Sequence, residues 1–187
     1  MPLTFANQIT IFRIILVPIF VAVVLYYLPQ RDYYRYIALS LFLFMALLDV
    51  LDGYIARRRK EKTYIGALLD PLADKLLLIS AFIVLYIMST LFPVVKFPIW
   101  LVVAVISRDG ILLLGALIIH LVQSKLVIKP NLIGKATTFF QVLCVAGILL
   151  QWEPSTYLFW PITFLLTIIS GMVYLKAGLS LLNNGGH

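Results

Sequence analysis

The chain has 187 residues, of which 63% are hydrophobic and only 12% are charged, and its mean hydropathy is +1.04. Soluble domains are roughly half apolar, so this composition excludes an ordinary soluble domain and indicates an integral membrane protein. The formal net charge of +7 is therefore read as a signal of membrane topology and of contact with anionic lipids, and no nucleic-acid partner is expected.

Apolar windows long enough to cross a hydrocarbon core of ~30 Å as a helix recur along the whole chain. They predict an all-α integral membrane protein with six transmembrane helices, over residues 9–28, 34–56, 66–90, 97–122, 132–151 and 156–181. Residues 2–10 mix apolar and polar side chains, which predicts a short N-terminal interfacial helix before the first span. Residues 1–182 are expected to form one membrane domain, and the polar tail 183–187 is interpreted as an added expression sequence.

The connections between the expected spans differ in charge. Residues 57–62, between the second and third spans, are strongly basic, and Lys125 and Lys129 lie between the fourth and fifth spans. By the positive-inside rule these connections face the cytoplasm. We therefore expect a protein of the inner (cytoplasmic) membrane with both termini in the cytoplasm.

Carboxylates are concentrated in the second and third spans. Asp49 and Asp52 are separated by three positions near the end of the second span, and Asp70 and Asp74 by four positions at the start of the third. Each pair therefore projects from one helix face, one turn apart. Ionised groups inside apolar helices are costly, so such pairs mark a functional site.

The short connection between these two spans predicts an antiparallel helical hairpin in which the four aspartates lie at one depth and converge. Without neutralisation, the carboxylates would repel one another and face a desolvation penalty of at least several kcal/mol. Divalent cations remove both costs. All-oxygen ligands favour a hard ion, Mg²⁺ or Mn²⁺, over zinc.

Small residues surround the carboxylates. Gly53, Ala56 and Gly66 keep the hairpin smooth, so a flat ligand or its phosphates can approach the backbone closely, although the same residues would also suit close helix packing. Arg57 lies one turn beyond Gly53, and its fork suits phosphate oxygens. Two hard cations beside a phosphate-binding arginine point to phosphoryl-type transfer with two metal ions.

The eight residues follow the pattern D-x2-D-G-x2-A-R-x8-G-x3-D-x3-D across residues 49–74. With every spacing intact, the pattern resembles the signature of the CDP-alcohol phosphatidyltransferase family, and segments 7–13 and 133–138 resemble it as well. Members of that family take a CDP-linked lipid as donor, release CMP and attach the phosphatidyl group to an alcohol. The resemblance therefore implies an enzyme with CDP-diacylglycerol and membrane lipids as partners, and a homodimer.

The resemblance also implies a role for each signature residue. Four are expected to bind two ions of Mg²⁺ or Mn²⁺: Asp49, Asp52, Asp70 and Asp74. Asp74 would also act as the general base that takes the proton from the acceptor hydroxyl. Five are expected to bind the CDP part of the donor: Asp49, Gly53, Ala56, Arg57 and Gly66. The active site would lie at the cytoplasmic face.

The acceptor is expected to contact Arg108 and Lys135, at positions where family members bind a glycerol-type acceptor. Phosphatidylglycerophosphate synthases, which use glycerol 3-phosphate, often carry a further arginine and lysine where this chain has Ala116 and Thr137. The residues therefore slightly favour phosphatidylglycerol as acceptor, as in eukaryotic-type cardiolipin synthases. Glycerol 3-phosphate is the alternative, and an inositol phosphate is a distant third.

Other interpretations stay open for several residues. Arg108 and Asp109 would also serve as a structural ion pair, and Lys135 as a snorkelling lysine that faces lipid. For Asn7, Thr10 and Arg13, contact with the donor and a purely local role are both possible. The rival for the whole chain is a divalent-cation transporter, but that class predicts carboxylates at mid-membrane on several helices and an internal repeat.

Overall fold

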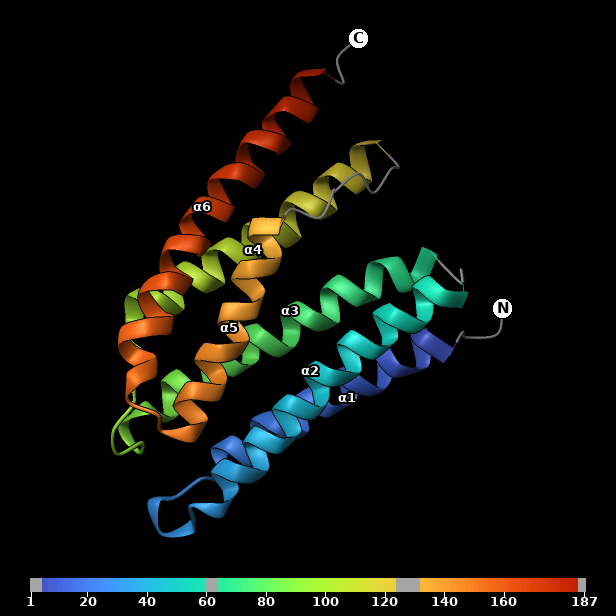
Figure 1. Cartoon of the computed structure of the whole chain (residues 1–187). Coiled ribbons are helices and arrows are strands. Elements are labelled where there is room, and N and C mark those ends of the chain that lie inside the picture. Colours follow the sequence, from blue (N-terminus) through green and yellow to red (C-terminus); the bar gives the residue numbers. More distant parts are fainter. Residues whose placement is uncertain (1–4, 60–63, 124–131, 185–187) are drawn as a thin grey trace. The chain divides into compact units, whose positions relative to one another are not determined.

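The computed structural model of the chain describes the backbone of residues 5–59, 64–123 and 132–184, and the side chains of residues 8–51, 72–115 and 132–176. Within these ranges every regular element is helical, which confirms the all-α prediction (Figure 1). The helices are α1 (Phe5–Leu25), α2 (Tyr33–Arg59), α3 (Tyr64–Ile87), α4 (Ile99–Gln123), α5 (Leu132–Leu150) and α6 (Pro154–Asn184). Two short 3₁₀ turns, η1 (Pro29–Arg31) and η2 (Met88–Thr90), follow α1 and α3.

Five described segments are long and apolar enough to cross a membrane. They are Gln8–Leu25, Tyr33–Leu51, Leu72–Thr90, Leu132–Leu150 and Pro154–Lys176. The expected fourth span coincides with α4, but the side chains at the end of α4 lie outside the described residues. The protein is therefore a membrane protein with several apolar helices, and the count of six spans stays a prediction.

The separate interfacial helix expected over residues 2–10 is wrong for the part that the structure describes. From Phe5 the chain is helical without a break to Leu25. No glycine or proline interrupts residues 5–17, so the helical hydrogen-bond ladder continues from the first turn into the span.

The helices group into two compact units. The first unit contains Met1–Phe97 and Val145–Trp152, and the second contains Pro98–Cys144 and Glu153–His187. All eight signature residues belong to the first unit, and Arg108 and Lys135 belong to the second. The units are described in turn.

In the first unit α1 packs against both α2 and α3. Its buried positions recur every three or four residues and form one face of the helix: Thr10, Arg13, Val17, Phe20 and Val24. Phe20 meets Phe42 of α2 with ring centroids 5.8 Å apart. The N-terminal end of α1 lies beside the C-terminal end of α2 and the N-terminal end of α3 (Figure 1). The polar start of the buried α1 face is therefore at the same end as the signature residues.

Gln151, which follows α5, is hydrogen-bonded to the connection between α3 and α4. Its Oε1 accepts hydrogen bonds from the amides of Val94 and Val95, both at 2.9 Å. Its Nε2 donates to the carbonyls of Val95, at 3.2 Å, and Ile148, at 2.7 Å. Gln151 itself has φ of 54°, a left-handed conformation that costs energy for a residue with a Cβ. The hydrogen bonds offset this cost.

Arg35 hydrogen-bonds two other segments of the same unit. Its Nε and Nη2 donate to the two carboxylate oxygens of Asp32, at 2.8 and 2.7 Å. Its Nη1 donates to the carbonyl of Leu149, at 3.1 Å. Because the last carbonyls of a helix have no partner within the helix, Arg35 serves as a cap for the C-terminal end of α5.

In the second unit α4 packs against α6, and α5 runs in the opposite direction to both (Figure 1). Trp100 and Phe164 form an edge-to-face pair with centroids 5.0 Å apart. The thiol of Cys144 lies 3.1 Å from the Thr163 hydroxyl and is buried. Cys144 is therefore a packed core residue of the second unit.

Candidate functional site

Asp49 of the signature is paired with Arg13, for which the sequence left donor contact and a local role both open. The guanidinium of Arg13 on α1 donates from Nη1 to Oδ1 of Asp49 on α2. The Arg13 side chain is 0% exposed, whereas that of Asp49 is 39% exposed. A buried cation needs such a partner, and Asp49 keeps part of its carboxylate open. The signal for this pairing in the sequence is the position of Arg13, a cation inside an apolar span.

Asp74, the expected general base, lies half-buried on α3. Its neighbours Ala73 and Leu77 are buried and hold this part of the helix in the first unit. Lys75, the next residue, is buried as well. Asp49 and Asp74 are the signature carboxylates whose side chains belong to the described residues.

The other signature residues are placed by their backbone alone. Asp52, Gly53, Ala56 and Arg57 lie in the last turns of α2, and Gly66 and Asp70 lie in the first turns of α3; their side chains lie outside the described residues. The ends of α2 and α3 meet as the expected hairpin (Figure 1). The helical spacing of both aspartate pairs is confirmed, and the convergence of the carboxylates stays a prediction.

The donor set fits a hard divalent ion by its chemistry, because the four signature aspartates supply only carboxylate oxygens. Within the described side chains no group of three or more histidines, cysteines, aspartates and glutamates stands close enough to hold a metal. Two of the four aspartates are outside that search. The site therefore rests on the signature and on the helix ends that carry it.

Arg108 on α4 is the centre of a buried polar cluster in the second unit. Its Nη1 lies 2.5 Å from Oδ1 of Asp109, and its Nη2 lies 2.6 Å from Oγ of Ser170 on α6. The side chain packs over the Tyr174 ring at 5.7 Å, and the residue is 5% exposed. The ion pair between Arg108 and Asp109 is confirmed. Contact of Arg108 with the acceptor stays a prediction.

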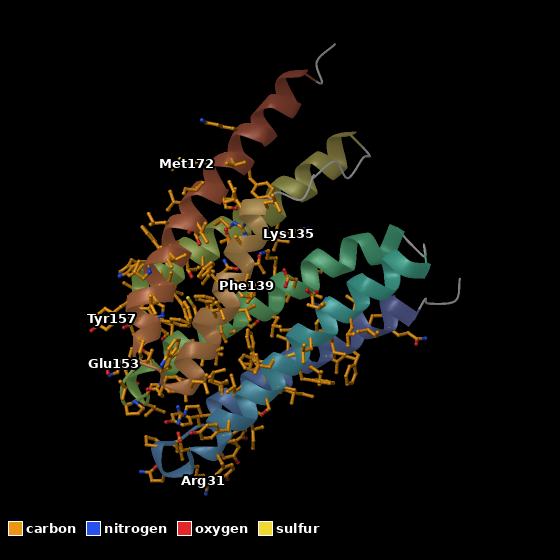
Figure 2. The ribbon with its side chains drawn as sticks, viewed as in Figure 1. Arg31, Lys135, Phe139, Glu153, Tyr157 and Met172 are labelled. Carbon is orange, nitrogen blue, oxygen red and sulfur yellow. The ribbon has the colours of Figure 1, made fainter. Side chains whose placement is uncertain are left out.

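Gly134 lets α5 approach this cluster. A Cβ at this position would lie 2.9 Å from Oη of Tyr174 and 3.3 Å from Nη2 of Arg108. Lys135, the next residue, is exposed and lies one turn before Phe139 on α5 (Figure 2). The exposed side chain leaves both expectations for Lys135 open, contact with an acceptor and snorkelling toward the interface.

The sequence reasoning missed three members of the buried cluster: Gln141, Ser170 and Tyr174. Gln141 is buried on α5 and its Nε2 lies 3.5 Å from Oδ2 of Asp109. Ser170 and Tyr174 are one turn apart on α6. Polar side chains at helical spacing inside apolar spans were the available signal, because they indicate a polar face turned away from lipid.

Comparison with known proteins identifies the family. The model of the CDP-alcohol phosphatidyltransferase family matches residues 3–173. The chain belongs to this family. The resemblance seen in residues 49–74 is thus confirmed over most of the chain, and the protein is a membrane-bound transferase.

Relatives of nearly the same length add to this identification. An enzyme of Bacillus subtilis (strain 168) named CDP-diacylglycerol–glycerol-3-phosphate 3-phosphatidyltransferase is 32% identical over 190 residues, which cover 90% of this chain and 91% of the relative. A Haemophilus influenzae protein of the same name is 32% identical over 184 residues and 94% of both chains. A probable phosphatidylglycerophosphate synthase of Mycobacterium tuberculosis is 30% identical over 179 residues, which cover 93% of this chain and 81% of the relative.

Proposed function

We propose that the protein transfers the phosphatidyl group of CDP-diacylglycerol to glycerol 3-phosphate and releases CMP. The observation that carries this proposal is the similarity, over about nine-tenths of the chain, to an enzyme named for these two substrates. The complete signature at residues 49–74 supplies the donor half of the reaction. The proposal replaces the preference for phosphatidylglycerol that the sequence alone suggested.

That preference rested on cations that are missing at two positions. Thr137 is buried, and its hydroxyl donates to the carbonyl of Ile133 at 2.8 Å, within its own helix. Because the Thr137 side chain is buried and bonded within its own helix, the lack of a lysine at this position is weak evidence against an acceptor that carries a phosphate. The side chain of Ala116 lies outside the described residues.

Lys135 and Arg108 are the proposed contacts for the acceptor phosphate. The exposed Lys135 offers a compact charge with three donors. Arg108 has N–H groups beyond the two that Asp109 and Ser170 occupy, because a guanidinium has more donors than these contacts use. An acceptor with a phosphate monoester needs such cations more than a neutral alcohol does.

Asp49, Asp52, Asp70 and Asp74 would hold two ions of Mg²⁺ or Mn²⁺, which when bound offset the charge that grows on the CMP leaving group. Arg57 would bind donor phosphate oxygens, and the backbone at Gly53, Ala56 and Gly66 would admit the nucleotide closely.

Asp74 would accept the proton of the acceptor hydroxyl as its oxygen forms a bond to the phosphorus of the phosphatidyl group. The bond from that phosphorus to the bridging oxygen breaks, and CMP leaves with its electron pair. The basic residues 57–62 support a cytoplasmic site with both termini on that side. A homodimer, which the family resemblance implies, is part of the same proposal.

Product analysis tests the proposal. Purified protein with Mg²⁺ and CDP-diacylglycerol is given glycerol 3-phosphate or phosphatidylglycerol in parallel, and lipid products and CMP are measured by mass spectrometry. We expect phosphatidylglycerophosphate with the first acceptor and no cardiolipin with the second. Cardiolipin as the main product would restore the alternative, and CMP release only when an inositol phosphate is offered would favour that third acceptor.

Asp74→Asn should abolish CMP release, because the amide cannot accept the proton and is a poorer metal ligand. Asp32→Asn is a matched control, since Asp32 is an aspartate of the same unit that pairs with Arg35 outside the signature. It should retain activity. Full turnover in the Asp74 variant would overturn the assignment of the general base, and a complete lack of CMP release by the wild type would favour the transporter.

A further inference from the structure

We propose that Arg13 is a built-in counter-cation of the signature carboxylates. It keeps the donor site folded when no divalent ion is bound, and its charge limits how tightly such ions bind. This inference rests on the proposed function, because it takes Asp49 as a metal ligand. The pairing of Arg13 with Asp49 is the observation that carries it.

Arg13 lies at the polar end of the buried face of α1. The buried face of α1 is apolar from Val17 to Val24 and polar at Thr10 and Arg13. α1 packs against both α2 and α3, the two helices that carry the signature, and its polar end contacts α2 through Arg13 and Asp49. The N-terminal end of α1 is beside the ends of these helices (Figure 1).

The charge of Arg13 stays buried whether or not a metal ion is bound. The Arg13 side chain is 0% exposed, so it has no route to water when the occupancy of the site changes. Leaving the charge buried without a partner would be strongly unfavourable. The interaction also joins residues 36 positions apart on different helices. Arg13 is therefore a fixed charge on α1 beside Asp49.

The Asp49 carboxylate is contacted by Arg13 and is also open to a metal ion. Arg13 contacts Oδ1, and the carboxylate is 39% exposed, so a metal ion has access to the remaining lone pairs. A cation in direct contact with a metal ligand has two opposite effects. It orients the ligand, and it repels the ion. Loss of such an orienting partner typically weakens metal binding 10–100-fold.

Charge decides between these effects. A fixed positive charge one carboxylate away from a divalent ion repels it with twice the strength that it would show toward a monovalent ion, and the partly dry surroundings screen this repulsion weakly. Asp49 also lies on a regular helix that packs on α1, so the backbone already restricts its orientation. Repulsion therefore outweighs orientation, and neutralising Arg13 should strengthen metal binding.

The test measures Mn²⁺ binding directly. Free Mn²⁺ is titrated by electron paramagnetic resonance against the purified wild type, Arg13→Gln and Arg13→Lys, and thermal unfolding is followed with EDTA and with Mn²⁺. Arg13→Gln should bind Mn²⁺ at least about tenfold more tightly, unfold at a lower temperature in EDTA and gain more from Mn²⁺ than the wild type does. Arg13→Lys keeps the charge and should bind within about threefold of the wild type.

Arg35→Gln is the matched control. Arg35 is a second buried arginine of the first unit, and it pairs with Asp32, outside the signature. Its loss should lower the unfolding temperature without changing Mn²⁺ affinity. If Arg13→Gln is too unstable without metal to be purified, it is prepared in Mn²⁺ and then titrated with EDTA as competitor.

Unchanged or weaker Mn²⁺ binding by Arg13→Gln would overturn the inference, and weaker binding would make Arg13 an orienting residue. These outcomes are separate from failure of the proposed function. A wild type that forms phosphatidylglycerophosphate in a metal-dependent reaction, with an Arg13→Gln variant that binds Mn²⁺ no more tightly, rejects the counter-cation alone. A wild type that binds no Mn²⁺ rejects the metal site as well.

Discussion

Nη2 of Arg108 on α4 donates a hydrogen bond of 2.6 Å to Oγ of Ser170 on α6, between residues 62 positions apart. The same guanidinium is paired with Asp109, so one side chain joins two helices of the second unit and neutralises a buried carboxylate. Arg108 is therefore a structural link between two helices. This role and the proposed contact with the acceptor need separate measurements.

Arg108→Met should destabilise the protein by about 3–5 kcal/mol, because the buried Asp109 would lose its counterion. The double variant Arg108→Met/Asp109→Asn removes both charges and keeps an acceptor for Gln141, so it should regain most of this loss. Thermal unfolding in detergent is the measurement. Equal stability of the single and double variants would contradict the pairing.

The same double variant separates structure from substrate binding. If Arg108 contacts the acceptor phosphate, the folded double variant should show a KM for glycerol 3-phosphate raised at least about tenfold, the loss of one charge-assisted contact. The KM for CDP-diacylglycerol should not change. Wild-type values for both substrates would mean that Arg108 is structural only.

Gly134→Ala should destabilise the protein by about 1–3 kcal/mol, because the added methyl group overpacks the space beside Tyr174 and Arg108. Gly110→Ala is the matched control, since a Cβ at Gly110 would meet nothing within 4 Å. It should be neutral or stabilising by up to ~1 kcal/mol through helix propensity. Unfolding temperatures of the two variants give the comparison.

Adding Tyr174→Phe to Gly134→Ala should recover part of the lost stability, because the closest atom to the new methyl group is Oη of Tyr174. The Tyr174→Phe single variant provides the reference. If the double variant is no more stable than Gly134→Ala, the strain lies in the contact with Arg108 instead.

The pairing of Asp32 with Arg35 should make stability depend on acid. Hydrogen bonds from the Arg35 guanidinium hold the pKa of the Asp32 carboxyl below its ordinary value of 3.8. A carboxyl whose pKa is lower in the folded state stabilises the protein above the unfolded pKa, and this contribution is lost as pH falls through the folded pKa. Wild type should therefore exceed Asp32→Asn in unfolding temperature near neutral pH.

The difference between these two proteins should shrink as pH falls below about 4, when the carboxyl is protonated in both states. In an Arg35→Gln background, Asp32→Asn should no longer change the unfolding temperature in a pH-dependent way, because the guanidinium donors to Asp32 are gone. A gap between wild type and Asp32→Asn that stays constant down to about pH 3 would show that the pair contributes nothing measurable.

Gln151 offers a test of backbone strain. Gln151→Ala loses the side-chain hydrogen bonds to Val94, Val95 and Ile148 and keeps the left-handed conformation at φ of 54°. Gln151→Gly loses the same bonds but adopts this conformation readily. Both should be destabilising, and glycine should be about 1 kcal/mol more stable than alanine. The reverse order would mean that the strain is not present in solution.

Much of the fold followed from local patterns. The apolar windows predicted the helices well, because a helix in lipid must satisfy its own backbone and needs a minimum apolar length. The interfacial helix was wrong because α1 runs unbroken from Phe5 into the span, and Thr10 belongs to its buried face. Amphipathic composition alone does not separate these two cases.

For the candidate site, the sequence alone determined the family, the aspartate pairs and their helical spacing, since a signature is a property of adjacent positions. Only the tertiary structure decided that Arg13 pairs with Asp49 and that Ser170 holds Arg108. Such pairs join residues 36 and 62 positions apart. Their formation depends on which helix faces meet, and helix packing, unlike helix formation, is not encoded in any local stretch of the chain.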